Sequence, residues 1–212
     1  MLDTIQSILT AVATGAGIYF AFDGLHAWKR EMTGKRDIEL CQKVIEMFYE
    51  AEHKMNVLRS PMSYTQEGEG RAKEEGETEE ETRRRNHLFV PIARFNTQSE
   101  FWSEFFSYRF RMRALFGDPA SDAFRPADEA IRSFRAAATT NYQAQFMDER
   151  GLNPETRRSF ENQIWAGTSD PDVIADKMRE AITAMEAICV PIVRATKPSE
   201  WLNQMHKRLR LF

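Results

Sequence analysis

Few residues in this sequence have the types and spacing that catalysis or metal binding requires. Glu50 and His53 form the one Glu-x-x-His pair in the sequence. Carboxylate-bridged di-metal sites in helical bundles take two such pairs from facing helices, together with two further glutamates. A lone pair on a charged helix face is typical of a solvated surface. The sequence therefore predicts no metal site here.

The two cysteines, Cys41 and Cys189, each lie in an apolar helical pattern, and neither belongs to a Cys-x-x-Cys pair. The four histidines are too scattered for a zinc finger or ribbon. A disulfide between the cysteines is one interpretation, and a pair of buried free thiols is the one we favour. Cys41 and His53 fall on different faces of a helix, which argues against a nucleophile–base pair.

Motifs of known catalytic sites are missing from the sequence, which has no P-loop, no Gly-x-Ser-x-Gly and no His-Glu-x-x-His. We therefore assign no catalytic, cofactor-binding or metal-binding residue and expect no cofactor, while enzyme activity stays open. The net charge of −3 creates no strong field, so we expect no nucleic-acid partner. Arg83, Arg84 and Arg85 form a basic cluster beside an acidic run. Neutralisation by the neighbouring glutamates is favoured over a contact with nucleic acid or anionic lipid.

The first structural element indicated by the sequence is an uncharged run of 19 residues, from 4 to 22. As a helix it would measure about 28 Å, close to the ~30 Å hydrocarbon core of a bilayer. Asp3 precedes it, and an aromatic residue and four basic residues follow it: Trp28, Lys29, Arg30, Lys35 and Arg36. By the positive-inside rule this pattern predicts a single-pass membrane anchor over residues 1–28, in the inner membrane, with the N-terminus outside and the rest cytosolic. A buried core helix and a cleaved signal peptide are the alternatives.

Small residues within this run are spaced four apart: Ala11 with Gly15, and Ala13 with Gly17. Such spacing lets two helix backbones approach closely in lipid. Self-association into a homo-oligomer through this face is one hypothesis, and a thin anchor without a helical partner is the other.

Beyond the anchor, apolar residues recur at helical spacing, and no segment alternates long enough for a strand. We predict an all-α fold in which the transmembrane helix is followed by a cytosolic antiparallel helical bundle. The expected parts are a first bundle helix over residues 29–60, a charged flexible loop over 61–78, the remaining bundle helices over 79–195 and a C-terminal amphipathic helix over 196–212. Thirteen of the 20 residues from 66 to 85 are charged, so nothing in the loop is expected to be buried.

Several helix starts are marked by capping residues. Thr78 with Glu81 and Thr97 with Glu100 match the capping box, and Asn153-Pro154 and Asp170-Pro171-Asp172 mark two later starts. Between them lies a periodic seam like that of a coiled coil, formed by Phe101, Phe105, Tyr108, Met112 and Leu115. Trp102, Phe106 and Phe110 widen it. We expect this aromatic face in the core, with a partner groove as the alternative.

The C-terminal helix combines apolar and basic residues, including Trp201, Lys207, Arg208 and Arg210. In an up-and-down bundle the preceding helix returns towards the bilayer, so these residues are candidates for lipid or interface contacts. A cap on the bundle is the favoured alternative. The pattern VPIxR occurs at residues 90–94 and 190–194. A duplicated proline kink is one hypothesis for it, and coincidence is the favoured one.

The anchor together with WKREMTGKR, MFYEAEHKMNVLRSPMS and FFSYRFRMRALFG resembles an uncharacterised bacterial family of small membrane-anchored helical proteins. The resemblance covers about half of the chain. It implies a bacterial inner-membrane setting and brings no activity and no functional residue.

Three functional hypotheses follow. The leading one is a membrane-anchored binding or scaffolding module whose partners are the lipid bilayer, a second copy of the chain and a protein of unknown identity. The second is a membrane-tethered enzyme or metal-binding bundle with a site that assembles only in three dimensions. The third is a membrane-active effector that acts through an oligomerising span.

Overall fold

The computed structural model describes residues 34–64, 66–144 and 152–194, in which the regular secondary structure is helical and no strand occurs. The first described helix covers residues 34–58. It is followed by α2 (Glu79–Thr97), α3 (Ser99–Phe116), the short α4 (Asp118–Asp122), α5 (Arg125–Gln143), α6 (Pro154–Ile164) and α7 (Val173–Arg194). The prediction of an all-α helical bundle is confirmed for this part of the chain.

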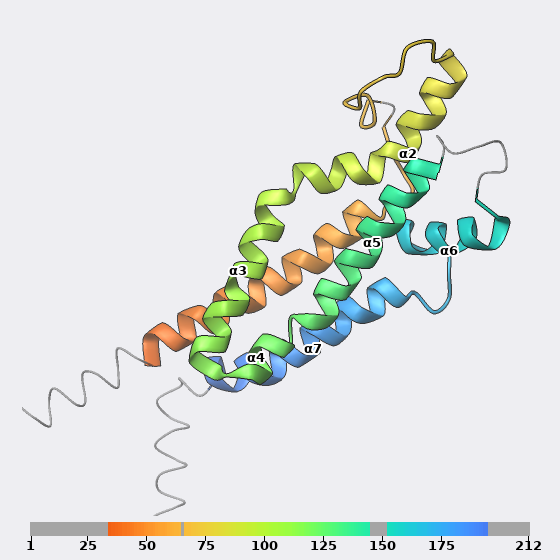
Figure 1. The fold of residues 1–212 in the computed structure, drawn as a ribbon. Coiled ribbons are helices and arrows are strands. Elements are labelled where there is room, and N and C mark those ends of the chain that lie inside the picture. The colour runs from red at the N-terminus through yellow and green to blue at the C-terminus, as the bar shows by residue number, and fades with distance from the viewer. Residues whose placement is uncertain (1–33, 65, 145–151, 195–212) are drawn as a thin grey trace, which may run out of the picture.

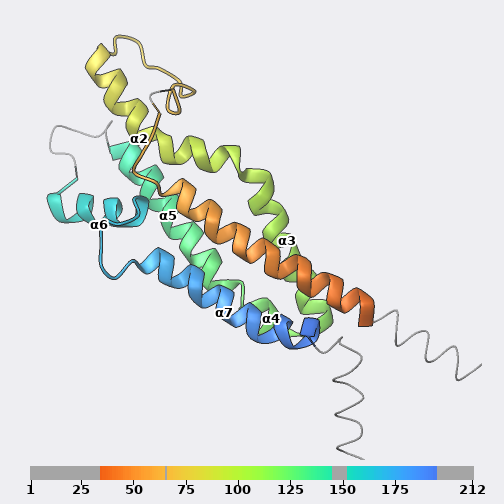
Figure 2. The same cartoon turned by 180° about the vertical axis from the view of Figure 1, so that it is seen from behind.

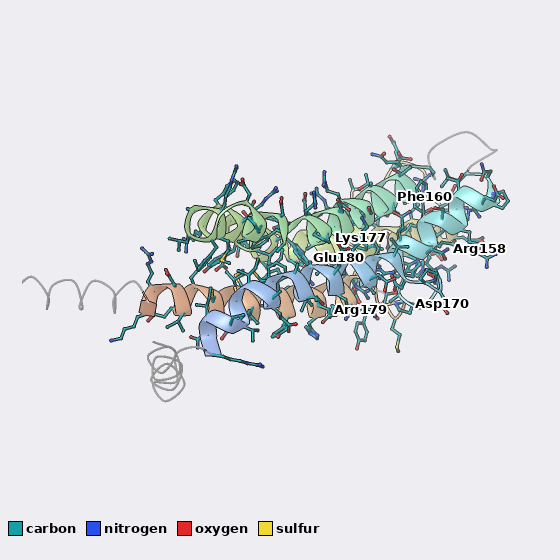
Figure 3. All side chains as sticks on the ribbon, turned by 90° about the horizontal axis from the view of Figure 1, so that it is seen from below. Arg158, Phe160, Asp170, Lys177, Arg179 and Glu180 are labelled. Atoms are coloured by element: carbon teal, nitrogen blue, oxygen red, sulfur yellow. The ribbon has the colours of Figure 1, made fainter. Side chains whose placement is uncertain are left out.

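Helix 34–58 and α7 run antiparallel along the length of the bundle (Figures 1 and 2). Three side-chain contacts follow each other along the pair: Cys41 with Cys189, Tyr49 with Glu186 and Arg59 with Asp172. Because each step forward on the first helix is a step backward on the second, residues 34 and 194 lie at the same end. We call it the terminal end. The opposite end carries α6 and the segment of residues 61–78, and Figure 3 shows Arg158 and Phe160 of α6 there.

Three phenylalanines from three segments form the centre of the core. Phe48 of helix 34–58 meets Phe105 of α3 with ring centroids 4.9 Å apart and Phe124, just before α5, at 4.8 Å. Phe105 and Phe124 are 5.3 Å apart, and all three side chains are buried. Edge-on and tilted ring contacts of this kind add to the burial of apolar area. The prediction that Phe105 lies in the core is confirmed.

The predicted seam on α3 is core for only part of its width. Met112 is buried with Phe105, and Phe101 and Tyr108 are partly buried against the same cluster. Trp102 is buried as well, whereas Phe110 and Leu115 are exposed. The expectation that Phe110 widens the buried seam is wrong, because residue 110 lies on the opposite side of the helix from residues 105 and 112.

The capping residues locate most helix starts. Thr78 and Glu81 form both hydrogen bonds of the capping box at the start of α2, so the predicted boundary at residue 79 is confirmed. Asn153 caps α6 by accepting a hydrogen bond from the Thr156 amide. The predicted capping box at Thr97 is wrong, because α3 begins one residue later, after Gln98, without a side-chain cap. The predicted break between the two helices is present, and α2 and α3 meet there at an angle (Figure 1).

The predicted anchor of residues 1–28 lies outside the described residues, and so does the predicted C-terminal helix of residues 196–212. Among the residues that are described, no helix is both long enough and apolar enough to cross a bilayer. The membrane anchor therefore stays a prediction.

Candidate functional site

The side chain of Arg59 is a buried clamp between three elements. Arg59 is the first residue after helix 34–58, and only 1% of its surface is exposed. One terminal nitrogen donates to both carboxylate oxygens of Asp172, at 2.9 and 3.0 Å. The other nitrogens donate to main-chain carbonyl oxygens at the end of α6, those of Asn162, Gln163 and Trp165.

This clamp satisfies groups that a helix end leaves without partners. The last carbonyl oxygens of a helix receive no hydrogen bond from an amide of that helix. At the end of α6 the Arg59 guanidinium donates these hydrogen bonds instead. Asp172 also accepts a hydrogen bond from the Ala175 amide in the first turn of α7, so it caps that helix while it neutralises Arg59. The guanidinium and the carboxylate are therefore both engaged in holding the fold together.

Arg94, the last residue of the first VPIxR pattern, performs a similar task at the end of helix 34–58. It donates to the carbonyl oxygens of Val57, Ser60 and Met62 and to the carboxylate of Glu67. The nearby guanidinium lowers the pKa of the Glu67 carboxyl. Arg194, which ends the second VPIxR pattern, is exposed at the end of α7. The two arginines therefore have different surroundings, while Pro91 and Pro191 both lie inside their helices.

A charged network holds the segment between helix 34–58 and α2. Arg71 is buried and donates to Glu77, to Asn86 at 2.7 Å and to the Ala72 carbonyl. Glu77 also accepts from Arg85 at 2.8 Å, and the paired guanidinium of Arg71 is the main reason why the pKa of its carboxyl is far below the ordinary value. The expectation that nothing here is buried is wrong, because an opposite charge and several hydrogen bonds offset part of the cost of burying the Arg71 guanidinium.

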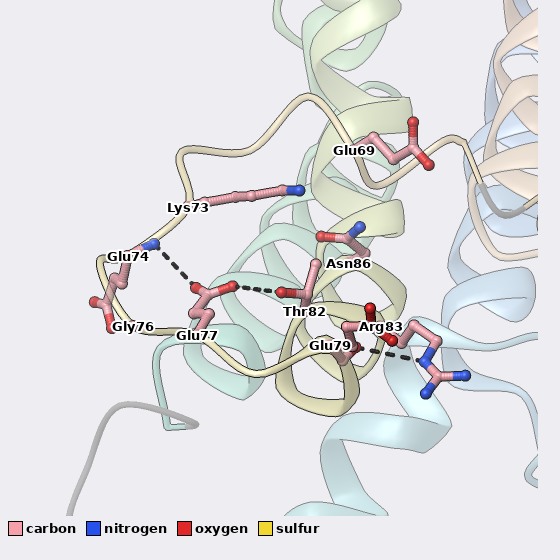
Figure 4. A pocket seen from close by; sticks show the side chains of 9 residues that line it. All are labelled: Glu69, Lys73, Glu74, Gly76, Glu77, Glu79, Thr82, Arg83 and Asn86. Atoms are coloured by element: carbon pink, nitrogen blue, oxygen red, sulfur yellow. Dashed lines mark hydrogen bonds between the residues drawn. The ribbon is translucent and has the colours of Figure 1, made fainter.

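The same network explains a close approach of two backbones. A Cβ atom on Gly68 would lie 2.0 Å from the Asn86 carbonyl oxygen, so only glycine fits there. The cavity beside it has a volume of about 550 Å³, and its nine lining residues include four glutamates together with Lys73 and Arg83 (Figure 4). Within the arginine cluster, Arg85 pairs with Glu74 as well as Glu77, which agrees with neutralisation by neighbouring glutamates.

The residues first considered for chemistry do not converge. His53 is exposed, and Glu50 pairs with Lys54 at 3.3 Å on the surface of helix 34–58. Cys41 and Cys189 are free, buried and in contact with each other, so the free-thiol interpretation is confirmed. Burial raises the pKa of both thiols. Across the described ranges, no group of three or more His, Cys, Asp or Glu residues could hold a metal ion.

A groove at the terminal end combines basic and apolar side chains. It lies between the first turns of helix 34–58 and the last turns of α3 and has a volume of about 470 Å³. Its lining residues are Arg36, Glu39, Leu40, Lys43, Tyr108, Arg111, Ala114 and Leu115. Three of these are basic and one is acidic. The guanidinium of Arg111 lies 5.0 Å from the centre of the Tyr108 ring, which holds a positive charge at the groove wall.

Of the predicted contact residues, only Lys35 and Arg36 belong to the described part of the chain, and Arg36 lines this groove. The remaining ones lie outside the described residues: Ala11, Ala13, Gly15, Gly17, Trp28, Lys29, Arg30, Trp201, Lys207, Arg208 and Arg210. The sequence interpretation did not single out Lys43 or Arg111. The signal that could have found Arg111 was its spacing, three residues after Tyr108 and four before Leu115, which places it beside the predicted seam on the same helix.

Neither a protein-family model, nor a curated protein, nor a solved structure matches this chain. The resemblance to a family of small membrane-anchored helical proteins therefore stays a prediction.

Proposed function

We propose that this chain is a binding or scaffolding module anchored at the cytosolic face of a bacterial inner membrane. The observation that carries the proposal is the position of the two described ends. The first residue of helix 34–58, shortly after the uncharged run, lies at the same end of the bundle as the last residue of α7, which precedes the predicted amphipathic helix of residues 196–212 (Figures 1 and 2).

A bundle attached to a bilayer through its N-terminus keeps its terminal end close to the lipid. The C-terminal segment of residues 196–212 would start from that same end, so its apolar and basic residues could reach the same surface. A spanning helix alone is an effectively irreversible anchor, so the amphipathic segment would add a second contact with the same surface and not the attachment itself.

The charges along the bundle support this orientation. Five exposed basic residues lie at the terminal end: Lys35, Arg36 and Lys43 on helix 34–58, and Arg111 and Arg113 on α3. Of these, Arg36 pairs with Asp37 and Arg113 with Asp118. The opposite end carries the glutamate-rich segment that precedes and begins α2. A cytosolic leaflet is negatively charged and attracts the first surface while it repels the second.

A topology experiment on the full chain tests the anchor. The chain should remain in the membrane pellet after alkaline extraction, and deletion of residues 1–28 should release it. A C-terminal fluorescent protein should be bright and a C-terminal alkaline phosphatase inactive. A matched control exchanges the flanking charges, with Asp3→Lys combined with changes of Lys29, Arg30, Lys35 and Arg36 to Glu. This variant should weaken or invert the orientation, whereas an active phosphatase on the unaltered chain would contradict the proposal.

The scaffolding part is tested by self-association. Two differently tagged copies of the full chain should co-purify in mild detergent. Gly15→Leu with Gly17→Leu should reduce this, because bulky side chains keep the two helix backbones apart. Ile5→Leu with Val12→Leu is the matched control, because these two residues lie between the small-residue faces on a helix. Equal recovery from all three forms would exclude the small-residue faces as the contact.

A further inference from the structure

We propose that the groove at the terminal end binds the headgroup of an anionic phospholipid in the bilayer. The inference rests on the proposed membrane anchor and adds to it a defined binding site and a ligand class. The site lies between helix 34–58 and α3, two elements that are far apart in the sequence.

The polar part of the groove suits a phosphodiester. Arg36 and Lys43 are exposed and stand two helical turns apart on helix 34–58, and Arg111 faces them from α3. An arginine can hold two phosphate oxygens at once, and a lysine adds a compact positive charge. Glu39 is the one acidic residue in the lining, and Arg36 also pairs with Asp37 beside the groove at 3.0 Å, so Lys43 and Arg111 carry most of the positive charge offered to a ligand.

The apolar part of the groove suits the beginning of an acyl chain. Leu40, Tyr108 and Leu115 line it beside the basic residues. Leu115 is 39% exposed, so an apolar side chain meets solvent directly next to cationic ones. A free phosphate would leave this surface wet, whereas a lipid with a charged head and an apolar tail covers both parts. This pairing favours a phospholipid over a soluble anion.

The position of the groove makes such a ligand available. Arg36 follows Trp28, the predicted interfacial residue, by only eight positions. The basic rim therefore starts within the stretch that leaves the bilayer in the proposed topology. Each basic residue held near an anionic leaflet contributes roughly a fivefold increase in affinity, equivalent to about 1 kcal/mol.

A fluorescent label on the full chain in lipid nanodiscs tests the site. An environment-sensitive dye is attached through Leu115→Cys, and the unaltered chain serves as a blank because both native thiols are buried. In discs that contain phosphatidylglycerol the dye emission should shift to the blue and be quenched by spin-labelled lipid. In discs of pure phosphatidylcholine neither change should occur. The same dye at Tyr64→Cys, at the opposite end, should respond in neither kind of disc.

Charge reversal provides the specificity control. Lys43→Glu with Arg111→Glu should abolish the response while the protein stays in the disc. The matched pair Arg157→Glu with Arg158→Glu, on exposed residues of α6 at the opposite end, should leave it intact. Inorganic phosphate added to phosphatidylcholine discs should produce no shift.

Four results would overturn the inference. An equal shift in both kinds of disc would mean an apolar contact without headgroup recognition, and a response to inorganic phosphate would mean a soluble-anion site. A shift that grows with the number of chains per disc would mean a contact between two copies. No response in any disc, with the chain still embedded, would refute lipid binding in the groove and would leave the proposed membrane anchor unaffected. Failure to enter discs at all would instead refute the proposed function.

Discussion

Replacing Asp172 by asparagine tests whether the buried Arg59 guanidinium depends on its carboxylate. The change keeps the helix cap, since an asparagine oxygen can still accept from the Ala175 amide. It removes the negative charge and one of the two oxygens that accept from Arg59. Removing one partner of a buried ion pair costs about 3–5 kcal/mol because the other charge is left without compensation. Arg59 is 1% exposed but the Asp172 side chain is 22% exposed, so water offsets part of the loss. We expect the lower end of the range, about 3 kcal/mol.

Thermal unfolding of the full chain in mild detergent, followed by far-ultraviolet circular dichroism, measures this effect. For a chain of this size about 3 kcal/mol corresponds to a midpoint roughly 6–12 °C lower. The matched control is Asp176→Asn, in the first turn of α7, the helix that Asp172 caps. Asp176 pairs with the exposed Arg179, so this change should cost less than about 1 kcal/mol. In an Arg59→Met background the additional cost of Asp172→Asn should nearly vanish, because no buried charge remains. Equal midpoints for the two asparagine variants would refute the argument.

Three further predictions concern the core, the charged segment and the thiols. Phe105→Ala should lower the free energy of unfolding by about 3–5 kcal/mol in the same thermal assay, whereas Phe110→Ala, at a side chain that is 74% exposed, should change it by less than about 0.5 kcal/mol; similar values would contradict the core assignment. The pKa of Glu77 is lowered by folding, so its contribution to stability is complete above about pH 4.5 and is lost as the pH falls further. The midpoint difference between the unaltered chain and Glu77→Gln should therefore shrink below that pH, while the exposed Glu75→Gln should show no such trend, and a pH-independent difference for Glu77 would exclude the ion pair as its source. Maleimide should label neither cysteine of the native chain and both after denaturation, because burial raises the pKa of the two thiols, and fast native labelling would show that they are accessible.

The sequence alone determined the helical class and several helix starts, such as those of α2 and α6. These features depend on residues a few positions apart, such as Thr78 and Glu81 at the start of α2 or the stepping of Phe105 and Met112 on α3. Their consequences, a cap and an apolar helix face, follow from local helix geometry. The free state of the cysteines was also predictable, since both belong to apolar helix faces.

The tertiary structure decided which polar residues are buried and what they contact. Arg59 and its partner Asp172 are separated by 113 positions, so no local pattern marks the arginine as a buried clamp. Arg71 is buried in a stretch whose composition indicates full exposure. Its guanidinium is buried because Glu77 and Asn86 accept its hydrogen bonds. Phe124 lies in no periodic pattern and joins the core only where α4 meets α5.

The groove at the terminal end likewise combines features that the sequence shows with a contact that only the tertiary structure creates. Its basic residues and its apolar residues are visible in the sequence, but they come from positions 36–43 and 108–115. Whether two such segments face each other depends on how helix 34–58 packs against α3, and that packing is set by the burial of Phe48 and Phe105 at the centre of the bundle. Sequence periodicity specifies which face of each helix is apolar. Only the packed bundle specifies which surface residues of two distant helices become neighbours.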